Sequence, residues 1–412
     1  MNEHVFHEWR DKPLDEVLYE SREMLEDTTF PTVRRWREAG GKVVGHFQVY
    51  FPEEIVHAAG LLPVKIRGAQ VEAMRADSRF GSYLCSILKT SLELALSGRL
   101  QLEMFVTHPI CDAARNLAAV WGRNFSYPCQ ILYLPQNANS SHAATYLRGE
   151  YDRLKRAVEA ISGAPVSGDP RRQSEFRLLL AAGFVSGAPV TDDGLRNSIT
   201  IYNQNRALLR ELYAIKRETP WLISADEAYA LVAIGGVIPR EEHNDLLRAV
   251  LPMIRERQVR PKDKIRVVFE GGFCEQPPLD LIRAIAQSCY VVDDDLLIGM
   301  RWMIDDVRLE GDPLMNLAEA YLEKSSYSPV QHDLRKPKEK MLLERIRSSR
   351  ADAAIITAAK MCEPGLEEQV AYTRALDEAG IPYFVGEFEE NMTTFDHMEI
   401  QLETFVENIL FS

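Results

Sequence analysis

The sequence of 412 residues lacks four features that would assign it to a common class: a long apolar run, a C-x-x-C pair, a P-loop and an excess of positive charge. Without a long apolar run, we expect no membrane-spanning helix. Lysine and arginine number 48 against 61 acidic residues, and the resulting net charge of −13 disfavours a nucleic-acid partner. The start of the chain, MNEH, has no export-signal pattern, and we therefore expect a cytoplasmic protein.

The composition is that of a globular protein, with 46% hydrophobic and 26% charged residues. A chain of this length predicts two or three domains. Structural disulfides are disfavoured in a reducing compartment, so the six cysteines are expected to be buried thiols, reactive thiols or metal ligands.

Strand and helix patterns alternate at both ends of the chain. Residues 42–50 predict a buried strand, Pro52 opens a helix that Gly60 ends, and residues 61–66 predict a second strand, which together form a βαβ unit. The middle of the chain shows only amphipathic helical patterns. We therefore expect an α/β fold with two Rossmann-like parallel-sheet domains, 1–140 and 263–412, joined by a helical connector or cap, 141–262.

The connector contains one internal similarity. Residues 161–169 (ISGAPVSGD) resemble residues 185–193 (VSGAPVTDD). A repeat architecture needs at least about three units, so we interpret the pair as a local duplication in a surface loop.

Three of the cysteines share a context. Cys85 and Cys111 each begin a predicted helix, and Cys362 lies between a predicted strand and a helix. Ligands of open α/β sheets collect past the carboxyl ends of strands, and helix N-termini favour thiolates. Spacing alone nevertheless favours three partly buried thiols over a metal cluster, because no known ligand spacing is present.

The other three cysteines carry weaker signals. Cys129 follows Pro128 and precedes a predicted strand, and Cys289 lies at a helix–strand boundary in an apolar setting. Both are expected to be packing residues. Cys274 follows Gly271-Gly272 and is interpreted as a turn residue, with a place on the substrate side of the site as the alternative.

Five segments carry a resemblance to a known family. The stretches VYFPEEIVHAAGLLPVKI, SYLCSILKTSLELAL and HPICDAARNLAAVW resemble the benzoyl-CoA reductase and 2-hydroxyacyl-CoA dehydratase family. So do VFEGGFCEQPPLDLIRAIAQSCYVVDDDLLIG and AAIITAAKMCEPGLEEQVAYTRALDEAGIPYFVGEFE, and the resemblance extends over nearly the whole chain. Within the family, the sequence looks most like the smaller cluster-bearing subunit of ATP-dependent benzoyl-CoA reductase.

The resemblance implies one [4Fe–4S] cluster held by Cys85, Cys111 and Cys362, with the fourth iron site open. It also implies a related sister subunit that carries its own cluster and a separate activator that hydrolyses ATP. The absence of a P-loop from this chain agrees with a separate ATPase.

The function implied by the resemblance is reductive dearomatisation of an aromatic acyl-CoA by low-potential electrons. One alternative is an (R)-2-hydroxyacyl-CoA dehydratase subunit, which acts through a ketyl radical anion of the thioester. Another is a subunit that only relays electrons to the sister subunit. The remaining alternative is a plain binding protein that holds no cluster.

Two histidines and an acidic run have weaker patterns. His108 lies on the loop before Cys111 and is a weak candidate for a catalytic proton donor. His57 is expected to be a packed helix residue. The run Asp293-Asp294-Asp295 is expected to be solvated or to cap a helix rather than to bind a cation.

Overall fold

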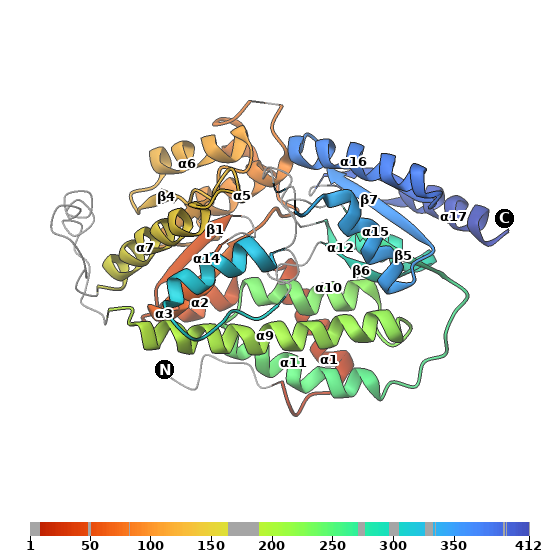
Figure 1. The fold of residues 1–412 in the computed structure, drawn as a ribbon, viewed down its shortest axis with the longest axis horizontal. Coiled ribbons are helices and arrows are strands. Elements are labelled where there is room, and N and C mark those ends of the chain that lie inside the picture. Colours follow the sequence, from red (N-terminus) through yellow and green to blue (C-terminus); the bar gives the residue numbers. More distant parts are fainter. Residues whose placement is uncertain are drawn as a thin grey trace.

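The computed structural model describes residues 9–47, 51–81, 83–163, 189–270, 277–295, 305–325, 333, 335–389, 392 and 394–411. Two four-stranded sheets, both entirely parallel, form the described fold (Figure 1). The predicted α/β class with two parallel-sheet units is therefore confirmed. The predictions for Cys274, Gly271-Gly272 and most of the duplicated segment concern residues outside these ranges.

The first sheet has the strand order β2-β1-β3-β4. Its strands are β1 (Val43–Phe47), β2 (Leu62–Ile66), β3 (Met104–Thr107) and β4 (Cys129–Ile131). Every residue of the first three strands is buried, which is typical of a parallel sheet covered on both faces. The accompanying helices are α2 (Pro31–Glu38), α3 (Glu53–Ala58), α4 (Met74–Asp77), α5 (Ser86–Leu96) and α6 (Asp112–Asn124).

The second sheet has the order β6-β5-β7-β8. Its strands are β5 (Ile265–Glu270), β6 (Cys289–Asp294), β7 (Ala353–Ala359) and β8 (Tyr383–Phe388). The central strand β7 is buried at every position, as its composition predicts. The accompanying helices are α12 (Leu279–Ser288), α15 (Lys338–Ser349), α16 (Glu363–Ala379) and α17 (Asp396–Leu410).

Long helices lie beneath both sheets in Figure 1. They are α1 (Leu14–Glu26), α9 (Asp192–Glu218), α10 (Ala225–Ala233), continued by a short 3₁₀ turn (Ile234–Gly236), and α11 (Arg240–Arg255). Helix α7 (Ala143–Ser162) lies beside the first sheet, and α14 (Pro313–Lys324) returns from the second half of the chain to pack against it. Helix α9 contacts α3 in the first half and β6 in the second, so it joins the two sheets. The domain boundaries at 140 and 262 stay a prediction.

Ion pairs with buried carboxylates connect α9 to the second sheet. Asp293, Asp294 and Asp295 are only 3–5% exposed, so the expectation of a solvated or capping cluster was wrong. Lys216 of α9 pairs with Asp294, and Arg217 lies 3.1 Å from Asp293. The sequence pattern could not show this, because the cations come from a helix that is distant in the chain.

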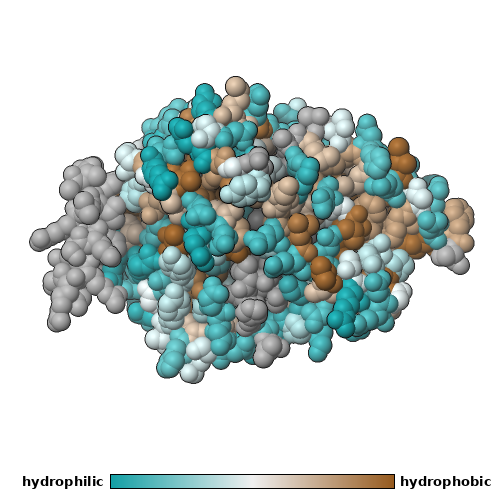
Figure 2. All heavy atoms as spheres, turned by 90° about the horizontal axis from the view of Figure 1, so that it is seen from above, coloured by the Kyte–Doolittle hydropathy of each residue, from teal (hydrophilic) through white to brown (hydrophobic). Residues whose placement is uncertain are grey.

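The outer surface is uneven in polarity. Figure 2 shows apolar residues gathered on the half of the upper face that corresponds to the second sheet in Figure 1. Exposed apolar side chains in this half include Val370 of α16, Val385 of β8 and Ile400 of α17. Within the described residues, no helix is both long and apolar enough to cross a membrane.

Candidate functional site at three helix N-termini

Each of the three predicted ligand cysteines is the N-cap residue of a helix. Cys85 precedes α5, Cys111 precedes α6 and Cys362 precedes α16. An N-cap side chain lies beside main-chain N–H groups that have no partner within the helix, and the helix dipole favours a negative charge there. At Cys111 this contact is direct, because the amide of Ala114 donates to Sγ at 3.3 Å. The fold therefore places all three cysteines at helix starts, where the helix dipole favours a negative charge.

The local sequence explains two of these positions. Cys111 follows β3 after a short turn, and Cys362 follows β7 after Lys360 and Met361. Met361 has a φ of 62°, a left-handed conformation that residues other than glycine rarely adopt. This residue turns the chain sharply from β7 into α16, where Pro364 occupies the first turn. Helix α16 begins at Glu363, directly after Cys362, which makes Cys362 the cap.

Cys111 and Cys362 are close together although they follow strands of different sheets. Burial is the main cause that raises the pKa of Cys111 to about 11, and the nearby thiol of Cys362 raises it further. The amides of Ala114 and Ala113 act in the opposite direction. Binding of a metal to the sulfur of Cys111 must therefore remove a proton, which the thiol retains at neutral pH when no metal is bound.

Cys85 is buried at the start of α5, and α5 packs against α6. Across the described ranges, no three His, Cys, Asp or Glu side chains gather closely enough to hold a single metal ion. A cubane cluster makes a different demand, because its thiolates bind separate iron atoms and do not converge on one point. Three soft thiols at helix N-termini, two of them close together, fit that demand in donor type and number.

The remaining described cysteines have the features of packing residues. Cys129 donates to the carbonyl of Ala118 at 3.4 Å, and burial raises its pKa to about 12. Cys289 is 2% exposed within the main apolar cluster, and burial raises its pKa to about 12 as well. Neither is an N-cap residue.

His108 is buried directly after β3. Its Nδ1 lies 3.1 Å from the carbonyl oxygen of Leu132, which fixes the proton on Nδ1. Burial lowers the pKa of His108 to about 4, so the ring is neutral at neutral pH. A neutral ring whose proton is directed at a main-chain carbonyl is poorly prepared to protonate a substrate, and a catalytic role for His108 stays a prediction.

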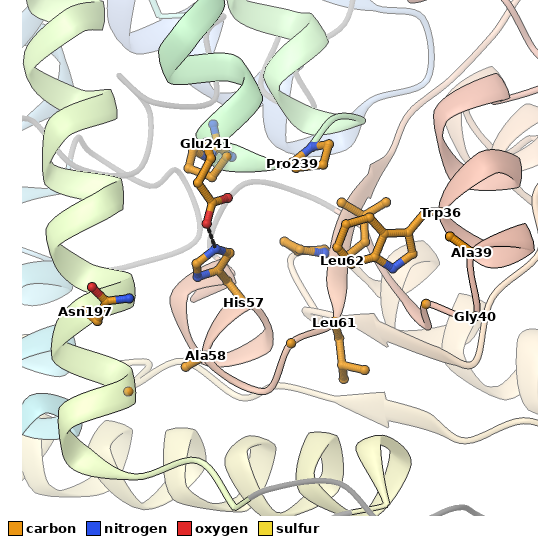
Figure 3. A pocket seen from close by; sticks show the side chains of 15 residues that line it. Trp36, Ala39, Gly40, His57, Ala58, Leu61, Leu62, Asn197, Pro239 and Glu241 are labelled. Carbon is orange, nitrogen blue, oxygen red and sulfur yellow. Dashed lines mark hydrogen bonds and ion pairs between the residues drawn. The ribbon is translucent and has the colours of Figure 1, made fainter. Parts of the chain in front are cut away.

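The described residues also line a cavity of about 610 Å³, which Figure 3 shows from close by. One wall is apolar and includes Trp36, Leu61 and Leu62, and the opposite wall carries His57 and Glu241. Leu61 and Leu62 lie at the amino end of β2, and the lining residues Gly40 and Gly41 lie just before β1. Cys111 and Cys362 lie past the carboxyl ends of strands, where ligands of parallel sheets bind. We therefore do not assign this cavity to the thiol chemistry, despite its size.

His57 connects this cavity to the helices below it. Its Nε2 lies 3.0 Å from Oε1 of Glu241, and its Nδ1 lies 2.9 Å from Oγ of Ser198. The Ser198 hydroxyl donates to the carbonyl of Glu54, so it accepts from His57. The sequence predicts that His57 is packed within the fold, but it lies at a cavity wall with 17% of its side chain exposed. Sequence reasoning missed Ser198 and Glu241, because both come from connector helices.

The comparison with protein families gives a match over nearly the whole described chain. The model of 2-hydroxyglutaryl-CoA dehydratase, D-component, matches residues 48–174 and 173–409. The chain belongs to this family. The residues that match the dehydratase D-component include Cys85, Cys111 and Cys362, and the family resemblance seen in the sequence is confirmed.

Three curated relatives of this dehydratase family show its range. A benzoyl-CoA reductase subunit of Thauera aromatica is 33% identical over 96% of this chain and 98% of its own length. The beta subunit of lactoyl-CoA dehydratase of Anaerotignum propionicum is 28% identical, covering 90% and 92%. The beta subunit of (R)-2-hydroxyglutaryl-CoA dehydratase of Acidaminococcus fermentans is 21% identical, covering 91% and 94%. The relatives are thus enzyme subunits named for reductases and for dehydratases.

Proposed function

We propose that this chain is the [4Fe–4S]-binding subunit of a benzoyl-CoA-type reductase. The observation that carries the proposal is the placement of Cys111 and Cys362, from two different sheets, at neighbouring helix N-termini. Cys85 begins the helix that packs beside α6 and supplies the third thiolate. When bound, the cluster supplies low-potential electron transfer to an acyl-CoA.

The residues of the chain itself have two tasks in this function. The cysteine thiolates hold the metal group, and the amides at each helix start stabilise their negative charge. The burial of Cys85 and Cys362 keeps water away from the thiolates, which suits an electron transfer that water or protons would divert.

Similarity to the relatives supports the choice of a reductase over a dehydratase. The benzoyl-CoA reductase subunit shares 33% of its residues with this chain, against 28% for the lactoyl-CoA dehydratase subunit. A dehydratase subunit is the second candidate, because the family model and the other two relatives carry dehydratase names. In either case we expect a sister subunit and a separate ATP-hydrolysing electron donor as partners.

The test is anaerobic purification of the chain with its sister subunit, followed by iron and sulfide analysis. About four irons per chain are expected. The complex is then mixed with the ATP-dependent donor and either an aromatic acyl-CoA or a 2-hydroxyacyl-CoA. Reduction of the aromatic ring supports the proposal, and loss of water from the hydroxyacyl-CoA supports the second candidate. A colourless, iron-free protein after reconstitution overturns both.

A further inference from the structure

A second, smaller cavity lies where both halves of the chain meet. Its volume is about 270 Å³, below the range of a site that encloses a whole drug-sized ligand. Its walls come from the end of α1, from Arg67–Gln70 after β2, from Tyr229 of α10, and from Pro277–Leu279 at the start of α12. The cavity is therefore suited to one chemical group rather than to a complete cofactor.

Arg67 is the unusual residue in this wall. Its Nε is buried without a hydrogen-bond partner, and in the described part of the chain no carboxylate lies within ion-pair distance of its guanidinium. Burial lowers the pKa of Arg67. Other buried arginines are paired, as Arg240 is with Glu53 and Arg345 with Glu270. An unpaired guanidinium in a partly buried position is costly, unless a ligand supplies the missing negative charge.

A second positive feature faces the same cavity. Helix α12 has 10 residues and begins at Leu279, directly after the N-cap residue Pro278. Both residues line the cavity, so the positive end of the helix dipole lies at its wall. Asp280 in the first turn is already engaged, because Arg283 pairs with it at 2.8 Å. A guanidinium and a helix start from opposite halves of the chain thus favour the same kind of ligand.

The carboxylate of Glu26 in the cavity wall disfavours a bound anion. Glu26 lines the cavity with Arg67 but is not within ion-pair distance of it. Burial is the main cause that raises the pKa of Glu26, and Asp280 and Glu23 add to it, whereas the positive charges of Arg283 and Arg67 act in the opposite direction. Glu26 therefore limits how tightly the cavity holds an anion, and its removal is expected to strengthen binding.

We propose that Arg67 and the start of α12 bind a phosphate group in this cavity. Resting on the proposed function, the source of that group is the phosphate-bearing end of the acyl-CoA, and free phosphate is the other source of the same chemistry. Arginine suits either source because its planar fork donates two parallel hydrogen bonds to phosphate oxygens.

The cavity is also connected to the thiol site through the main chain. The amide of Ala69 donates to Oγ1 of Thr90 at 3.2 Å, and Thr90 lies on α5, the helix that begins after Cys85. The loop that carries Arg67 is therefore held by the helix that carries a proposed ligand. A phosphate bound here is anchored to the same rigid element as the thiol.

The experiment measures equilibrium binding of CoA, 3′-dephospho-CoA and inorganic phosphate to the anaerobically purified complex. Arg67→Gln is expected to weaken CoA binding by at least about tenfold, and Arg67→Lys by less, because lysine keeps the charge but loses the fork. Glu26→Gln is expected to tighten it. Arg374→Gln, which removes an exposed arginine paired with Glu378 at 3.0 Å, serves as the matched control and should leave binding unchanged.

The three probes separate the sources of phosphate. Arg67-dependent binding of CoA that free phosphate does not reproduce identifies the CoA end, and 3′-dephospho-CoA shows whether its 3′-phosphate is the bound group. Arg67-dependent binding of inorganic phosphate alone identifies the free anion. CoA and phosphate binding that Arg67→Gln and Arg67→Lys both leave unchanged overturns the proposal.

Two further readouts keep this proposal distinct from the proposed function. Without ligand, Arg67→Gln is expected to raise the denaturation midpoint, because it removes an unpaired, partly buried charge. Phosphate or CoA should then stabilise the unmodified protein but not the variant. Iron content should be the same in both, so a loss of binding with intact iron supports the anion site. Iron-free protein that still binds CoA through Arg67 would overturn the cluster but not this site.

Discussion

Cys362 lies close enough to Cys111 that a negative charge on its sulfur raises the pKa of the Cys111 thiol, although the two cysteines follow strands of different sheets. Neither thiol could reach the other unless the two sheets pointed their carboxyl edges toward a common region. The relationship therefore links the arrangement of the two halves to the chemistry that we propose for them.

The first prediction concerns the ligand cysteines. Alanine at Cys85, Cys111 or Cys362 is expected to abolish stable cluster binding, because two thiolates hold a cubane poorly. Cys129→Ala is the matched control, since Cys129 is a partly buried thiol that caps no helix, and it should retain about four irons per chain. Iron analysis and visible absorbance under anaerobic conditions provide the measurement. Full iron content in the Cys362 variant would exclude it as a ligand.

The second prediction concerns acid stability. Burial alone would raise the pKa of Glu53, but Arg240 and His46 outweigh it and lower the pKa from 4.5 to about 2. A lowered carboxyl pKa stabilises the fold above pH 4.5, and this contribution is lost as the pH falls toward 2. Glu53→Gln is expected to cost about 3 to 5 kcal/mol at neutral pH, because it leaves Arg240 buried without its partner.

Denaturant titrations of both proteins between pH 7 and pH 3 test this expectation. The difference in unfolding free energy should shrink as the pH falls. Glu378→Gln, which removes an exposed carboxylate paired with Arg374, should cost less than about 1 kcal/mol at every pH. A constant difference between the Glu53 variant and the unmodified protein would contradict the role given to Glu53.

The third prediction concerns the connection between α9 and the second sheet. Lys216 is 3% exposed and pairs with Asp294, which also accepts a hydrogen bond of 2.6 Å from Tyr213. Lys216→Met is expected to destabilise the protein by about 3 to 5 kcal/mol, because it leaves a buried carboxylate uncompensated. Chemical denaturation measures the effect. The exposed Arg374→Met should change stability by less than about 0.5 kcal/mol, and equal effects in the two variants would contradict the prediction.

The fourth prediction uses two helix ends with the same backbone conformation. Arg350 caps α15 with a φ of 52°, and Gly380 caps α16 with a φ of 66°. Glycine adopts this conformation without the steric cost that other residues bear, so Arg350→Gly is expected to stabilise the protein by about 0.5 to 1 kcal/mol. Gly380→Ala should destabilise it by about 1 kcal/mol. Thermal unfolding measures both, and a loss of stability in the Arg350 variant would show that its side chain matters more than its backbone.

Local patterns in the sequence determined most of the elements around the thiol site. The buried runs that became β1, β3, β5 and β7 have strand composition, and the turns after two of them carry Cys111 and Cys362. Local information is sufficient for this, because the burial of a parallel strand and the capping of a helix depend on residues close in the chain. The family was also recognisable, since its motifs are continuous stretches of sequence.

Only the tertiary structure decided which distant residues meet. It placed Cys111 near Cys362, paired Lys216 with Asp294, and put Arg67 in a cavity built from both halves, beyond ion-pair distance of every carboxylate in the described ranges. No pattern in the sequence distinguishes a paired charge from an unpaired one, because pairing depends on the packing of helices and strands that are far apart in the chain. The sequence therefore determined the elements and the cysteine candidates, and the packing of α9 and the two sheets decided which side chains share a site.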